Sequence, residues 1–216
     1  MIAVTGATGA IGGAVARHLY DAGAAQRLVV RNPGRASRLS GVPVAAASYG
    51  DTPALLDAFD GTDTLLDFTF LRDNLYLDAF PYMVGDDGVI RGPSGAGRVG
   101  AVARADVAEA AAAVLTSAGH SGATYDLTGP ESLTVAEIAA AFTKAWGRPV
   151  RYEAETLDEA YRSRERYGAP AWKVAGWVTS YTAIAAGDLD VVTTAVQDLT
   201  GHRATSLADY LAQHPR

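Results

Sequence analysis

The sequence predicts an α/β protein in which a parallel sheet is flanked by helices. Three observations lead to this class. Short apolar segments alternate with helical segments through the first 66 residues, and a glycine-rich turn joins the first apolar segment to the first helix. The helices between strands also supply the right-handed crossovers that neighbouring parallel strands require.

The first strand is expected at Ile2–Thr5, an apolar run that ends at a glycine. A helix follows at Ala10–Asp21, because Ile11, Val15 and Leu19 recur on one helical face. The other elements expected in this half are strands at residues 28–30, 42–46 and from 64–66, a polar turn at 31–34, a short helix through Leu39 and a helix at 53–59.

The second half mixes strands and helices. We expect strands at residues 68–71 and Thr124–Leu127, and a glycine-rich, hairpin-like stretch at residues 85–100. Helices are expected after an Asp106 cap, after a Thr134–Glu137 capping box that leads to a stop at Gly147, and over most of residues 157–211. A soft boundary near residue 80 separates a front strand–helix half, 1–80, from a mixed rear half, 81–216.

Composition excludes several classes of protein. The 216 residues are 49% hydrophobic and 19% charged, which is the composition of a folded domain rather than a disordered chain. Cysteine is absent from the sequence, so disulfide scaffolds, thiolate metal sites and cysteine nucleophiles are excluded. The net charge of −6 disfavours a nucleic-acid partner, and no apolar run is long enough to span a membrane. With no basic leader at the N-terminus, we expect a cytoplasmic protein.

The glycine-rich turn is the motif that carries chemistry. Glycines at this place let the backbone turn tightly and approach a pyrophosphate, while the helix N-terminus directs free N–H groups at the phosphates. The spacing is G-x-x-G-x-x-G, between a strand and a helix. The predicted phosphate-binding residues are Gly6, Ala7, Thr8, Gly9, Ala10, Ile11 and Gly12.

Arginine follows the second strand, where NAD-binding folds carry an acid for the ribose 2′-hydroxyl. Arg31, followed by Asn32, predicts NADPH instead, because a guanidinium can bind a 2′-phosphate that a carboxylate would repel. Asp51 follows the third strand and leaves two interpretations open: a contact to the adenine amino group, or the N-cap of the next helix.

Other polar and aromatic residues are interpreted structurally. Residues 92–97 resemble a phosphate loop only in composition and are expected to form a turn. The histidines are too far apart in sequence for a metal site, and no metal is expected. Surface positions are expected for His18, His120, His202 and His214, core or pocket positions for Trp146, Trp172 and Trp177, and a solvated helix face for Arg162, Arg164 and Arg166.

The Tyr-x-x-x-Lys pair of most short-chain dehydrogenases is missing. Its lysine lowers the pKa of the tyrosine that donates a proton. Here the lysines are Lys144 and Lys173, and the residues four positions before them are Ala140 and Ala169.

Several motifs in order resemble the NmrA-like atypical short-chain dehydrogenases, and within them the NADPH-dependent quinone oxidoreductases. The motifs are residues 6–12, V-R-N-P at 30–33, Y-G-D at 49–51, L-R-D-N-L-Y at 71–76, R-A-D-V-A at 104–108, Y-D-L-T-G at 125–129 and T-S-L-A-D at 205–209. The resemblance implies a Rossmann-like fold with a small C-terminal substrate lobe. It also implies hydride transfer from NADPH to a quinone or similar carbonyl acceptor, without a Tyr-x-x-x-Lys pair.

The resemblance further places Asp73, Asn74 and Tyr76 at the acceptor pocket, although Asp73 stands where a neutral residue is expected. It also implies a further helix, strand and helix after Leu66, roughly 60 residues by the length of βαβ units. In this chain Leu66 is followed directly by Asp67. Either the protein lacks the segment, or the printed chain omits it, and we favour an omission. The main alternative function is a non-catalytic redox sensor that binds NADP(H). A weaker alternative is a sugar-nucleotide or flavonoid-type enzyme. A homodimer is left open.

Overall fold

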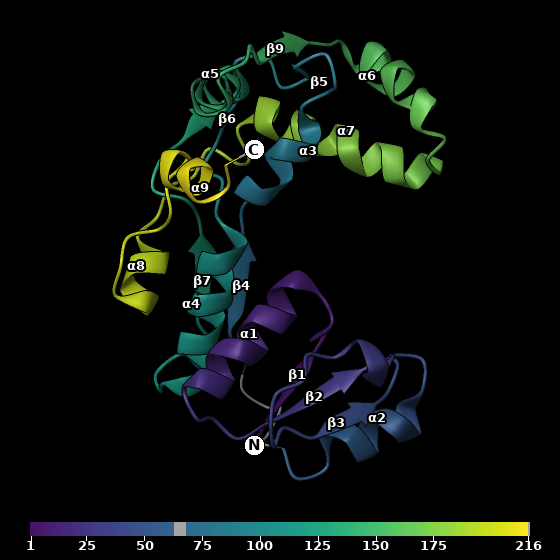
Figure 1. Ribbon diagram of the computed structural model, residues 1–216, viewed down its shortest axis with the longest axis vertical. Helices are drawn as coiled ribbons and strands as arrows, with labels where there is room; N and C mark the ends of the chain where they lie inside the picture. Colours follow the sequence, from purple (N-terminus) through teal and green to yellow (C-terminus); the bar gives the residue numbers. More distant parts are fainter. Residues whose placement is uncertain (63–67, 216) are drawn as a thin grey trace. The chain divides into compact units, whose positions relative to one another are not determined.

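The computed structural model describes residues 1–62 and 68–215, and the chain divides into two compact units (Figure 1). Unit 1 comprises Met1–Arg72, Arg104–Asp126 and Ala195–His202, and unit 2 comprises Asp73–Ala103, Leu127–Thr194 and Arg203–Arg216. The first crossing between them follows Arg72, near the boundary expected at residue 80. Later crossings return two segments of the second half to unit 1, so each unit is built from separate stretches of chain.

A parallel sheet of strand order β1-β2-β3 forms the N-terminal part of unit 1. Its elements are β1 (Ile2–Thr5), α1 (Ala10–Asp21), β2 (Gln26–Val30), the short 3₁₀ helix η1 (Pro33–Arg35), β3 (Val44–Ala46) and α2 (Thr52–Phe59). Thr5 is in register with Val29, and Val30 with Ala46. The carboxyl ends of the three strands therefore meet at one edge of the sheet, as the α/β prediction requires.

The rest of unit 1 comes from later in the chain. It contains α4 (Arg104–Thr116), α8 (Ala195–Thr200) and most of β4 (Phe70–Asp73) and β7 (Thr124–Leu127), whose last residues belong to unit 2. The N–H of Phe70 donates to Ala123 and that of Asn74 to Leu127, each at 3.0 Å, so β4 and β7 run parallel. Helices α1 and α4 lie against each other (Figure 1), and their contact is closed by a cluster of small and branched residues: Val15, Ala16, Leu19, Ala108 and Ala112.

Unit 2 is built on helices and short strand pairs. Its elements are η2 (Leu77–Ala79), α3 (Phe80–Met83), β5 (Val89–Gly92), β6 (Arg98–Val99), β8 (Leu133–Thr134), α5 (Val135–Trp146), β9 (Arg151–Ala154), α6 (Leu157–Arg164), η3 (Glu165–Tyr167), α7 (Ala171–Ala186) and α9 (Leu207–Gln213). β5 pairs with β9 in parallel, and β6 pairs with β8 antiparallel. The core is fully buried at Phe80, Ile90, Val99, Ile138 and Phe142.

Local signals predicted several elements correctly. Helix α1 has the predicted bounds, and so do β1 and β7. The Thr134–Glu137 capping box is present at the start of α5, and Gly147 ends this helix with a φ of 64°. A left-handed C-cap is a conformation that glycine adopts at little cost, which is why its sequence signal is dependable.

Three local predictions were wrong. The short helix through Leu39 is only the 3₁₀ turn at Pro33–Arg35. Residues 85–100 do not form a hairpin between β5 and β6, because each of these strands pairs with a distant strand; the local pairing is one antiparallel bridge between Val84 and Ile90. Asp106 does not cap α4 but lies buried in its first turn, since the helix begins two residues earlier, at Arg104.

The strand expected at 68–71 is β4, which begins two residues later, at Phe70. The strand expected from Thr64 and the join between Leu66 and Asp67 fall on residues 63–67 and lie outside the described part of the chain. Over residues 1–62 and 68–215, no helix combines the length and apolarity needed to cross a bilayer.

Candidate functional site

The glycine turn between β1 and α1 is tightly closed. Gly6 has a φ of +65°, and its carbonyl accepts a hydrogen bond from the N–H of Gly9 at 2.8 Å. A Cβ on Gly12 would lie 2.5 Å from the Gly6 carbonyl oxygen, which real side chains do not tolerate. Gly6 therefore provides the left-handed turn, and Gly12 allows α1 to pack directly against it.

The N-terminus of α1 is open to an anion. Its N-cap is Gly9, which has no side chain to cap the first turn, and the first turn contains no acidic residue. Thr8 and Gly9 are exposed, whereas Ala7 is buried beneath them. The unbonded N–H groups of a helix start and the positive end of its dipole favour phosphate.

Arg31 and Asn32 follow β2 at the same edge of the sheet. Because Thr5 is in register with Val29, the residues after β1 and after β2 leave the sheet side by side. Arg31 is exposed there. The Asn32 side chain accepts a hydrogen bond from the N–H of Gly34 at 3.0 Å, so it shapes the turn after β2.

Asp51 follows β3 and caps α2. Its Oδ1 accepts a hydrogen bond from the N–H of Ala54 at 3.1 Å, which establishes the capping interpretation. A contact to adenine stays a prediction. Unit 1 thus brings the predicted cofactor residues to one sheet edge: Gly6–Gly12 after β1, Arg31 and Asn32 after β2, and Asp51 after β3.

An open depression of about 500 Å³ in unit 2 brings together the predicted pocket residues Asp73, Asn74 and Tyr76. Sequence reasoning missed the other wall, which comes from α7 and the segment after it. That wall consists of Thr179, Ser180, Ala183 and Leu189, and Leu75 completes the lining. No local motif marks these residues, because only the packing of α7 places them there.

Hydrogen bonds hold the polar residues of this depression in place. The Tyr76 hydroxyl donates to Oδ2 of Asp73 at 2.9 Å. Partial burial raises the pKa of the Asp73 carboxyl, and the hydrogen bond from Tyr76 lowers it in part. The Asn74 amide donates to the Leu189 carbonyl at 3.0 Å, and its Oδ1 accepts from the N–H of Leu75 at 2.7 Å.

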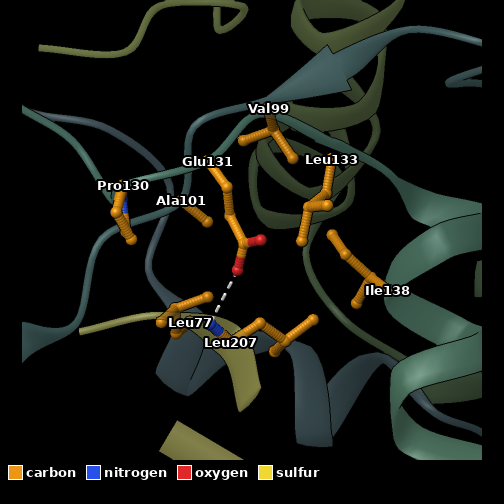
Figure 2. A pocket seen from close by; sticks show the side chains of 8 residues that line it. All are labelled: Leu77, Val99, Ala101, Pro130, Glu131, Leu133, Ile138 and Leu207. Atoms are coloured by element: carbon orange, nitrogen blue, oxygen red, sulfur yellow. Dashed lines mark hydrogen bonds between the residues drawn. The ribbon is translucent and has the colours of Figure 1, made fainter. Parts of the chain in front are cut away.

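A second cavity in unit 2 is much smaller (Figure 2). It measures about 10 Å³, room for at most about one water molecule. The Glu131 carboxylate points into it among apolar side chains and accepts a hydrogen bond from the N–H of Leu207 at 3.1 Å. This carboxylate holds the start of α9 and has no room for a substrate.

The arginines of α6 differ from the expected solvated face. Arg164 is buried and forms an ion pair with Glu155 at 2.8 Å, in which both side chains are about nine-tenths buried. It also donates to the carbonyls of Ala160 and Arg91. The prediction was wrong for Arg164, because the packing of α6 on β5 turns this position inward.

The prediction for Trp172 was wrong, and two of the histidines have partners in the structure. Trp172 is 76% exposed and belongs to neither core nor pocket. His202 pairs with Glu109 at 2.9 Å, and the His120 ring lies within hydrogen-bond distance of Ser117 and Tyr125. Across the described residues, no three acidic or histidine side chains are grouped as a metal site.

Residues 1–75, which hold β1 to β3 and the glycine turn, match the NmrA-like family. Over this segment the chain is similar to that family. Its α/β fold is Rossmann-like, as the solved structures of similar proteins are NAD(P)-binding oxidoreductases.

Two oxidoreductases match this chain over nearly its whole length. Quinone oxidoreductase 2 of Escherichia coli (strain K12) is 27% identical over 276 residues, covering 97% of this chain and 96% of the relative. The (4-alkanoyl-5-oxo-2,5-dihydrofuran-3-yl)methyl phosphate reductase of Streptomyces griseus is 29% identical over 278 residues, covering 99% and 98%.

Solved structures agree with this placement. The NADPH-dependent quinone oxidoreductase of Escherichia coli, complexed with NADPH, superposes with a TM-score of 0.88 at 25% identity and 99% coverage of both chains. Triphenylmethane reductase of Citrobacter sp., complexed with NADP(H), gives 0.87 at 25% identity and 99% coverage of both chains.

The alignments also bear on the missing segment. The match to the Streptomyces reductase extends over 278 residues, whereas this chain has 216. The relative therefore has residues inside the aligned range that have no counterpart here. That agrees with the missing helix, strand and helix expected from the sequence; the position predicted for it, after Leu66, lies outside the described residues.

Proposed function

We propose that this chain is an NADPH-dependent oxidoreductase that reduces a quinone or a similar carbonyl acceptor by direct hydride transfer. The observation that carries the proposal is the sheet edge of unit 1, where an uncapped helix start and Arg31 follow neighbouring strands. The names of the quinone-reducing relatives support the acceptor class.

The residues at this edge fit NADPH. The N-terminus of α1 has free N–H donors and no acid in its first turn, so a pyrophosphate finds donors without repulsion. Arg31 is exposed at the end of β2 and can pair with a 2′-phosphate. When bound, NADPH supplies the hydride. A carbonyl acceptor that takes up a hydride also needs a proton to complete its reduction.

The depression of unit 2 is the proposed acceptor site. Leu75, Ala183 and Leu189 provide apolar surface for a ring system, and Asp73 and Tyr76 provide polar groups at its side. No Tyr-x-x-x-Lys pair exists in the sequence, so the proton comes from solvent or from a pocket group.

The second candidate is a non-catalytic NADP(H) sensor. The relatives contain a segment that this chain lacks, and this difference favours the sensor. Loss of one wall of the nicotinamide site would leave cofactor binding without turnover. Loss of NADPH absorbance in the presence of menadione separates the two. Steady turnover supports the oxidoreductase, whereas saturable NADPH binding with no turnover of any quinone supports the sensor.

We also propose a cytoplasmic location and, as a second proposal, a homodimer. Light scattering on the purified protein tests the oligomeric state. Fractionation of cells that express the chain tests the location.

A further inference from the structure

We propose that Asp73, held by Tyr76, makes the depression of unit 2 select neutral and cationic aromatic acceptors and reject anionic ones. This inference rests on the proposed function, because it treats the depression as the acceptor site. It goes further by assigning a specificity-determining residue and the charge class of the acceptor.

The first support is the charge of the lining. The eight residues around the depression include one acid, Asp73, and no Lys, Arg or His. Tyr76 fixes Oδ2 of Asp73 from the same segment, at 2.9 Å. The nearest cation in sequence is Arg72, which is engaged by both carboxylate oxygens of Asp126, at 2.6 and 2.7 Å. The field inside the depression is therefore negative whenever Asp73 is ionised.

The second support is the shortage of hydrogen-bond donors. The hydroxyls of Thr179 and Ser180 donate to the carbonyl of Gly176 in their own helix, so they offer acceptor lone pairs to the depression. The Tyr76 hydrogen goes to Asp73, and one hydrogen of the Asn74 amide goes to the Leu189 carbonyl, which leaves one further donor on this amide. A sulfonate or phosphate needs donors, and this lining offers mainly acceptors.

Among the described residues that line the depression, few titratable groups accompany Asp73. Tyr76 faces it from the following turn, α7 contributes only the neutral Thr179 and Ser180, and Arg72 precedes it in β4. Partial burial raises the pKa of Asp73. The discrimination between acceptor charges should therefore weaken as the pH falls through that pKa, because the protonated carboxyl carries no charge.

The experiment compares three naphthoquinones: menadione, a naphthoquinone sulfonate and a trimethylammonium-substituted naphthoquinone. The readout is the ratio of kcat/KM for the cationic acceptor to that for the anionic one. Taking the ratio in each protein variant cancels the different reduction potentials of the acceptors. Asp73→Asn keeps the shape of the side chain and an oxygen that accepts from Tyr76, but it removes the negative charge. For acceptors whose unit charge binds within about 4 Å of residue 73, the ratio of kcat/KM values should therefore fall by roughly tenfold or more.

Asp86→Asn is the matched control. Asp86 is an exposed acid of the same unit that does not line the depression, so its loss should leave the ratio unchanged. The unaltered protein provides a second route, since its ratio should approach the Asp73→Asn value in acidic buffer. An equal ratio in Asp73→Asn and the parent protein, together with a ratio that does not respond to pH, overturns the proposal.

Failure of the proposed function gives a different result. If none of the three quinones is reduced, calorimetric titration of the same quinones into the protein without NADPH still measures charge selectivity. Even then, the inference is supported if the parent protein binds the naphthoquinone sulfonate more weakly than the other two quinones and Asp73→Asn removes this difference. Equal binding of all three quinones to both proteins refutes it.

Discussion

Exchanging Arg31 for aspartate should weaken NADPH binding while NADH binding holds or improves. Arg31 is exposed immediately after β2, beside the turn that precedes α1. A 2′-phosphate bound there faces a guanidinium in the parent protein and a carboxylate in the variant. NADH has a hydroxyl at this position, which a carboxylate can bind.

The size of the effect follows from the exposure of the site. Two unit charges about 4 Å apart interact by about 1 kcal/mol in water and about 4 kcal/mol near a protein surface. Because Arg31 is exposed, we take the lower part of this range for both the lost attraction and the gained repulsion. The sum is about 3 kcal/mol, which corresponds to a roughly hundredfold higher Kd for NADPH.

Fluorescence or calorimetric titration with each cofactor measures the change. Arg17→Asp is the control, since Arg17 is an exposed arginine on α1 whose replacement changes the net charge equally. The Arg31→Asp effect should shrink in high salt, as expected for an exposed ion pair. Equal losses for NADPH and NADH, or an equal loss in the control, would remove Arg31 from the 2′-phosphate role.

Three further predictions concern the turn, the fold and the acceptor pocket. Gly9→Val should abolish NADPH binding without changing the thermal midpoint by more than a few degrees, because its branched side chain occupies the space of the pyrophosphate; unchanged titration would make the turn purely structural. Arg164→Ala should lower the free energy of unfolding by about 3 kcal/mol, since it leaves a carboxylate buried without its partner, and the exposed Arg162→Ala should change it by less than about 0.5 kcal/mol. Comparable urea midpoints for these two variants would contradict the burial argument. Tyr76→Phe removes a hydrogen bond that lowers the pKa of Asp73, so the pH at which acceptor discrimination is lost should rise; a pH profile that stays in place would exclude the contact.

Signals confined to a few neighbouring residues predicted structure well. The capping box at Thr134, the stop at Gly147 and the bounds of α1 depend on contacts within one turn of chain, and all three are present. The predicted cofactor residues meet at one edge for a similar reason, because parallel strands separated by helices place their carboxyl ends together.

Partners that are distant in sequence were not predictable in this way. The stretch at 85–100 contains the glycines of a hairpin, but β5 pairs with β9 and β6 with β8. The i, i+2 and i, i+4 spacing of Arg162, Arg164 and Arg166 gives no indication which of them faces inward. Arg164 faces inward because it pairs with Glu155 and donates to the Arg91 carbonyl, and both of these partners lie outside α6.

The sequence by itself determined the α/β class, the glycine turn and the basic residue after the second strand, because these depend on backbone conformation and on residue order. Only the tertiary structure decided that Arg164 is buried and that α7 forms the second wall of the depression beside Asp73. The physical reason is the range of the interaction: caps and turns are closed by residues a few positions apart, whereas burial and the lining of a pocket depend on which distant segments pack together.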